Sequence, residues 1–112
     1  MKYDIKEQYN CVVISFKGNV MGGPDAEAFR DKLHEYIEKG MNQIVVDLGN
    51  VKFMNSSGLG VLIGGHTTMK NAGGEFVICR ADKKIESLLM VTQLIKVFKH
   101  FRKLDEAIAH FN

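Results

Sequence analysis

The sequence predicts an α/β domain with a mixed sheet of about five strands and about four helices, in the order β-β-α-β-α-β-α-β-α. Short apolar runs alternate with segments whose apolar residues recur every three or four positions, which is the pattern of strands alternating with helices. The run over residues 43–48 is apolar at consecutive positions, as expected of a central strand covered on both faces. This order predicts a largely parallel sheet with right-handed crossovers and with most helices on one face.

Size and composition predict one soluble globular domain over residues 1–112. Hydrophobic residues make up 46% and charged residues 25% of the chain, which excludes a disordered protein. The net charge is +2 and the basic residues form no run, so we expect no nucleic-acid binding. We also expect no membrane association and a cytoplasmic location, because neither a signal peptide nor an apolar run of membrane-spanning length is present.

The two cysteines and four histidines do not form a site. Cys11 and Cys79 lie in strand-like apolar runs and make no CxxC motif, so we expect buried, reduced thiols. No two histidines are three or four residues apart on one face, so we expect no metal.

The first third of the chain predicts a hairpin and a helix. Tyr3 to Gln8 alternates weakly, Tyr9-Asn10 offers a turn, and Cys11 to Lys17 alternates again, which indicates an antiparallel pair of strands. Pro24 then suits the first position of a helix of about four turns. Gly40 ends that helix.

The later elements follow in the same alternation. After the central strand, Gly49-Asn50 is expected to turn the chain before a short segment, Val51–Met54. The next helix is expected to place Leu59, Leu62, Ile63, His66 and Met69 on one side. This helix is expected to run from about Ser57 to Asn71. It is followed by a strand over Glu75–Cys79, a short helix marked by Ile85, Leu88 and Leu89, a strand at Val97-Phe98, and a helix over Leu104–Phe111.

The most informative stretch is Asn55-Ser56-Ser57-Gly58-Leu59-Gly60, at the start of the second predicted helix. A serine there can cap the helix, bind an anion or accept a phosphoryl group. A phosphate adds about −1.5 to −2 charges, which the free amides and the dipole of the helix tolerate but a partner burying the hydroxyl does not. We expect Ser57 to be the cap; the alternative, in which both serines only cap the helix, stays open.

The presence of four glycines within residues 58–65 needs a structural or functional explanation, because each glycine destabilises a helix by about 1 kcal/mol relative to alanine. Gly60 and Gly64 lie on one face, where they permit close approach of the sheet or of a docked partner. Gly58, in the first turn, leaves the amide donors uncovered.

Two enzymatic interpretations are weak. Gly58, Gly60 and Gly64, followed by Asp82, resemble a dinucleotide fingerprint, but five residues separate them from the strand and the chain is too short for two nucleotide-binding halves. A serine nucleophile lacks the GxSxG elbow and a histidine with an orienting carboxylate. We therefore predict a binding protein that is not an enzyme and uses no cofactor.

Three segments resemble the bacterial anti-sigma-factor antagonists, the STAS-domain family: Ile44–Leu48, Val51–Leu62 and Gly73–Cys79. The resemblance spans nearly the whole chain and implies a single STAS-like domain. It implies that the unphosphorylated protein binds an anti-sigma factor that is also a serine kinase, and so releases the sigma factor. The kinase would phosphorylate Ser56 and a PP2C-type phosphatase would reverse this step.

The resemblance also implies a partner-binding surface formed by the helix start and the loop before the first helix. Its expected residues are Gly22, Gly23, Asp25, Asn55, Ser56, Ser57, Gly58, Leu59 and Gly60. The sequence departs from the family at Asn55, where an aspartate is usual, and this puts kinase recognition and phosphatase attack in question. The alternative within this fold is a scaffold module that binds constitutively in a signalling or lipid-transport assembly.

Overall fold

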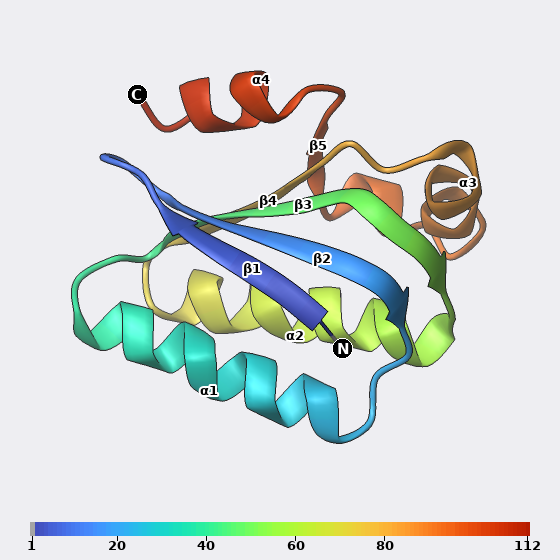
Figure 1. Cartoon of the computed structure of the whole chain (residues 1–112), viewed down its shortest axis with the longest axis horizontal. Coiled ribbons are helices and arrows are strands. Elements are labelled where there is room, and N and C mark those ends of the chain that lie inside the picture. Colours follow the sequence, from blue (N-terminus) through green and yellow to red (C-terminus); the bar gives the residue numbers. More distant parts are fainter. Residues whose placement is uncertain (1) are drawn as a thin grey trace.

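A five-stranded sheet in the order β1-β2-β3-β4-β5 runs through the molecule (Figure 1). In the computed structural model, which describes residues 2–112, β1 pairs antiparallel with β2 and all other pairs are parallel. The strands are β1 (Lys2–Glu7), β2 (Val12–Val20), β3 (Gln43–Met54), β4 (Glu75–Cys79) and β5 (Lys99–Phe101). The helices are α1 (Pro24–Glu38), α2 (Ser56–Asn71), α3 (Lys83–Val91) and α4 (Leu104–Ala109), with a 3-10 turn, η1 (Leu94–Lys96), before β5. The predicted mixed sheet and element order are confirmed.

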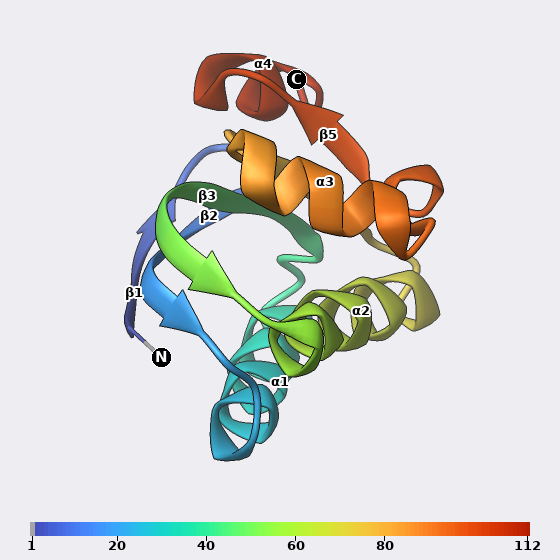
Figure 2. The same cartoon turned by 90° about the vertical axis from the view of Figure 1, so that its right-hand side faces the viewer.

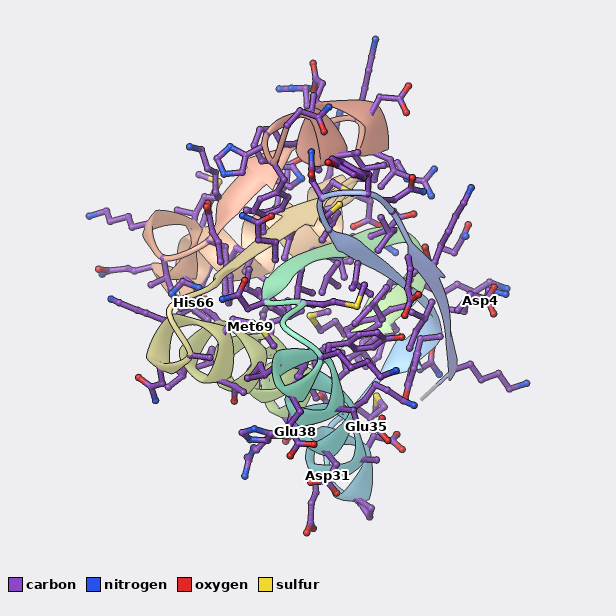
Figure 3. The ribbon with its side chains drawn as sticks, turned by 90° about the vertical axis from the view of Figure 1, so that its left-hand side faces the viewer. Asp4, Asp31, Glu35, Glu38, His66 and Met69 are labelled. Carbon is purple, nitrogen blue, oxygen red and sulfur yellow. The ribbon has the colours of Figure 1, made fainter. Side chains whose placement is uncertain are left out.

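The two faces of the sheet are covered unequally. The larger core joins the sheet to α1, α2 and α3, whereas the smaller core joins the opposite face to α4. Figure 1 shows α1 and α2 on one side of the sheet and α4 on the other. Figure 3 labels Glu35 and Glu38 on α1, which are both exposed, and Met69 of α2, which is fully buried in the larger core. Most helices therefore lie on one face, as the sequence predicts.

Gly49 and Asn50 do not form the predicted turn, because β3 continues through them to Met54. The pairing with β2 advances from Ser15 opposite Asp47 to Lys17 opposite Asn50, so β3 holds an extra residue there. A second irregularity follows at the next pairs along the strands. Such bulges bend and twist a strand, and these two reorient the end of β3 that leads into α2.

A buried carboxylate within β3 holds the residue that follows β4. Asp47 is 2% exposed and accepts hydrogen bonds from Arg80 Nε at 2.8 Å and Arg80 Nη2 at 2.7 Å. It also accepts from the Gly49 amide at 3.0 Å and from the Ser15 hydroxyl at 3.3 Å. Burial by itself raises the pKa of Asp47, but these hydrogen bonds and the Arg80 charge outweigh it and lower the pKa.

The same cluster explains two local features. The Arg80 guanidinium covers Gly49 so closely that a Cβ at Gly49 would lie 2.4 Å from Arg80 Cζ. Cys79 is a buried free thiol beside Asp47, and burial, followed by that negative charge, raises its pKa to about 12. Cys11 is likewise free and buried, and burial raises its pKa. The prediction of two buried free thiols is confirmed.

The last strand begins two residues later than predicted. Val97 and Phe98 follow η1, and the strand itself is Lys99–Phe101. Phe98 is 4% exposed and its ring centroid lies 5.5 Å from that of His66 and 6.3 Å from that of Phe76. Phe98 therefore makes its core contact from a loop. In sequence, two adjacent apolar residues in such a loop look the same as a short strand.

Candidate functional site

The candidate site lies where β3 ends and α2 begins, beside the loop that joins β2 to α1. Since β2 and β3 are parallel neighbours, their carboxyl ends meet at this edge of the sheet. Figures 1 and 2 show the start of α2 at the same end of the molecule as the start of α1 and as α3.

Asn55, rather than Ser57, caps α2. The Asn55 side chain accepts a hydrogen bond from the Gly58 amide at 2.7 Å, from an extended backbone with φ −104° and ψ −177°. Ser56 and Ser57 are the first two residues of the helix, and both are exposed. The prediction that Ser57 is the cap is wrong: α2 begins at Ser56, and the residue before it, Asn55, is the cap. The capping role is thus filled without either serine hydroxyl.

Two glycines bring the β2–α1 segment against α2. A Cβ at Gly58 would lie 1.9 Å from the carbonyl oxygen of Val20, so only glycine fits between the helix and the end of β2. Gly22 has φ +82°, and a Cβ there would lie 2.7 Å from the carbonyl oxygen of Ser57. The loop and the first turn of α2 therefore form one packed unit.

Gly60 and Gly64 do not approach the sheet, contrary to one of the two predicted explanations. A Cβ at either position would have nothing within 4 Å. The close contact with the core is made instead by Gly65, where a Cβ would lie 2.6 Å from the Phe76 ring. Ile63 is also misplaced by the predicted stripe, since it is 39% exposed. The outer face of α2 is consequently open along Gly60, Ile63 and Gly64.

The other predicted residues lie around the same corner. Gly23 has φ +74° and precedes α1, and its carbonyl oxygen accepts from the Ala26 amide at 3.0 Å. Asp25 is partly buried in the first turn of α1. Leu59 is 2% exposed, so its side chain belongs to the core and only its backbone is near the surface.

Apolar side chains that the sequence analysis did not single out flank the serines. Phe53, near the end of β3, is 51% exposed, and Met21, in the loop before α1, is 46% exposed. Exposed apolar side chains beside a polar site are typical of protein-binding surfaces. Their exposure depends on how the end of β3 and the β2–α1 loop pack, which local sequence does not show.

The start of α2 presents an exposed serine at a helix N-terminus, a position that accommodates an added negative charge. The Ser56 hydroxyl is exposed at the N-terminus of a helix of 16 residues whose first turn contains no acidic residue. Asp82, the acidic residue of the possible dinucleotide fingerprint, caps α3 by accepting from the Ile85 amide at 2.9 Å. Within residues 2–112 no group of three or more histidine, cysteine or acidic side chains is placed to hold a metal ion. No helix in that described range has the length and apolarity to cross a membrane.

Comparison with known proteins gives one consistent result. The family model of the STAS domain matches residues 2–107. The anti-sigma F factor antagonist of Paenibacillus polymyxa is 33% identical over 92 residues, which cover 81% of this chain and 79% of that protein.

Solved structures show the same fold. An anti-sigma factor antagonist from Mycobacterium paratuberculosis superposes with a TM-score of 0.80 at 21% identity, over 98% of this chain and 92% of the other. The phosphorylated form of the Bacillus cell fate determinant SpoIIAA superposes with a TM-score of 0.75 at 19% identity, over 99% of this chain and 100% of the other.

Proposed function

The chain belongs to the STAS domain family, and we propose that it is an anti-sigma factor antagonist that is switched off by phosphorylation of Ser56. The observation that carries the proposal is the placement of Ser56. Its hydroxyl is exposed in the first turn of α2, on a turn already capped by Asn55. The name of the Paenibacillus polymyxa relative and the fold shared with phosphorylated SpoIIAA support it.

The physical basis of the switch is the difference between the free domain and the complex. A phosphate on Ser56 would face the free amides and the positive end of the α2 dipole, so the folded domain accommodates the charge. Asn55 satisfies the Gly58 amide whatever the state of Ser56, so the turn does not depend on the hydroxyl. A partner that packs on the neutral serine would have to desolvate a near-dianion, at a cost of several kcal/mol. That cost is enough to dissociate an interface of micromolar affinity.

The binding surface follows from the packed corner. Ser56, Ser57 and the backbone of Gly58–Gly60 would contact the partner together with the Gly22–Asp25 loop, because Gly22 packs directly on Ser57. We propose that the partner is an anti-sigma factor with serine kinase activity, that a PP2C-type phosphatase restores the serine, and that the protein acts in the cytoplasm as a binding protein and not as an enzyme.

The test compares three variants with the wild type in binding to the cognate anti-sigma factor, measured by calorimetry. Ser56→Asp should weaken binding by at least tenfold, whereas Ser56→Ala should bind like the wild type but accept no phosphate from the kinase and ATP. Ser57→Ala is the matched control, because it removes the neighbouring exposed hydroxyl, and it should still gain one phosphate by mass spectrometry.

Two results would contradict the switch. Phosphate found on Ser57 instead of Ser56 would show that the phosphoacceptor is wrongly assigned. Equal binding by Ser56→Ala, Ser56→Asp and the wild type would favour a constitutive scaffold module, which needs no change at the serine.

A further inference from the structure

A groove runs between the end of β3 and α3, next to the candidate site. Its volume is about 180 Å³, and its apolar walls are formed by Phe53 and Met54 on one side and by Ile85 and Leu88 on the other. Figure 2 shows α3 lying beside the end of β3 and the start of α2. We call this the β3–α3 groove.

Among the apolar residues that line the groove, Phe53 is exposed and Leu88 is partly buried, whereas Met54 and Ile85 are buried. Phe53 is 51% exposed, although an aromatic ring at the end of a strand is ordinarily packed against its neighbours. Along α3 the apolar surface continues from Leu88 to Val91, which is three residues further on the same side and 83% exposed. Contiguous exposed apolar side chains beside a hollow mark a surface that binds another protein.

The charges at the groove determine which partner it fits. Lys52 and Lys84 line the groove, and both are exposed. Among residues 2–112, the salt bridges involve neither of them. The one acidic residue of the groove, Asp82, accepts a hydrogen bond from the α3 amide of Ile85. Within the described residues, the groove therefore combines an apolar lining with two lysines that form no salt bridge.

The groove is also continuous with the proposed binding surface, since Phe53 precedes Asn55 by two residues and Ser56 by three. We infer that the β3–α3 groove receives a segment of the same anti-sigma factor that contacts Ser56, with apolar side chains for the floor and carboxylates for Lys52 and Lys84. This inference rests on the proposed function and adds a second contact to it. A groove contact does not require the serine hydroxyl, so it supplies affinity while the serine supplies the switch.

The experiment measures binding of the full chain to the cognate anti-sigma factor for two groove variants and two controls. The groove variants are Phe53→Ala and the double variant Lys52→Glu with Lys84→Glu; the controls are Tyr9→Ala, which removes a ring that is 99% exposed in the β1–β2 turn, and Lys70→Glu, which reverses a charge in the last turn of α2. Circular dichroism checks that each variant is folded, which is expected because all the altered side chains are at least half exposed or lie on the surface.

Phe53→Ala should weaken binding about tenfold, as truncation of an interface anchor does. The double lysine variant should weaken it about tenfold at low salt and much less at about 0.5 M salt, because salt screens exposed charges. Both controls should bind like the wild type.

The possible failures are distinguishable. If the wild type binds and Ser56→Asp does not, but both groove variants bind like the wild type, the groove inference is overturned and the proposed function stands. If the wild type does not bind the anti-sigma factor at all, both are overturned. If Phe53→Ala changes self-association in light scattering and leaves partner binding unchanged, the groove is a contact between copies and the inference is wrong.

Discussion

The contact between Gly58 and the end of β2 predicts a large effect from the smallest possible substitution. A methyl group at Gly58 would place its carbon 1.9 Å from the Val20 carbonyl oxygen and 2.8 Å from the Val20 carbonyl carbon. Ordinary contact begins at 3.4 Å, so strand and helix would have to separate by about 1.5 Å. Both neighbours are backbone atoms held in regular elements, so neither can rotate away as a side chain would.

Gly58→Ala should therefore destabilise the fold by about 2 kcal/mol. Overpacking of a tight contact costs about 1–3 kcal/mol, and backbone neighbours place this site at the upper end. Alanine recovers about 1 kcal/mol of helix propensity, which reduces but does not cancel that loss. Chemical denaturation in urea, followed by circular dichroism, measures the difference directly.

Gly60→Ala is the matched control, since it lies in the same helix with nothing within 4 Å of its Cβ. It should stabilise the protein by about 0.5–1 kcal/mol through propensity alone. The reasoning would be refuted if Gly58→Ala were as stable as the wild type, or if the two variants shifted the urea midpoint in the same direction.

Three further predictions concern the cap, the buried carboxylate and the thiols. Asn55→Ala should lower the free energy of unfolding by about 1 kcal/mol, whereas Asn55→Asp should keep the cap, add a favourable helix-end charge of about 0.3–1 kcal/mol and so match or exceed the wild type in urea. Asp47→Asn should cost about 2 kcal/mol at pH 7, because the bonds from Arg80 lose their charge assistance. The pKa of Asp47 in the folded protein lies below its ordinary value of 3.8, so the carboxylate contributes its full stabilisation above pH 3.8 and loses it as the pH falls through the folded pKa. The difference in unfolding free energy between the wild type and Asp47→Asn should therefore shrink in acid. A difference that grew in acid would contradict the assignment. Cys79, with a pKa of about 12, should resist iodoacetamide at pH 8 until the protein unfolds, and rapid labelling in mass spectrometry of the native protein would show that the thiol is accessible.

The order of the elements was predictable because hydrophobic periodicity survives in each long segment. The continuity of β3 was not, since a Gly-Asn pair is the usual sign of a turn and here lies within a bulged strand. The position of β5 was missed for a related reason. Gln93 adopts a left-handed conformation with φ 63°, and the chain then buries Phe98 from a loop. Neither the bulge in β3 nor the loop before β5 can be recognised from the local amino-acid composition.

At the candidate site too, the sequence predicted the location and missed details that depend on packing. The serines at the start of α2 were found from the strand before them and the glycines after them. Which residue caps the helix depended on where the helix begins, and the cap is Asn55, two residues before the serine that was expected. Which glycines touch the core depended on how α2 is rotated: Gly58 and Gly65 make such contacts, and Gly60 and Gly64, for which the sheet was one of two possible neighbours, do not. The β3–α3 groove arises only when distant segments pack, so no window of sequence contains it.

The strand order bears on how the sheet is assembled. Each strand pairs with the strands that precede and follow it along the chain, so no strand must wait for a distant partner. Pairing between strands that follow one another along the chain keeps short the loops that must close to form the sheet. The corner that holds Gly22, Asn55 and Ser56 is built from β2, β3 and the start of α2, about the first half of the chain. The β3–α3 groove also needs α3, so the proposed switch and the proposed second binding surface are built from different parts of the chain.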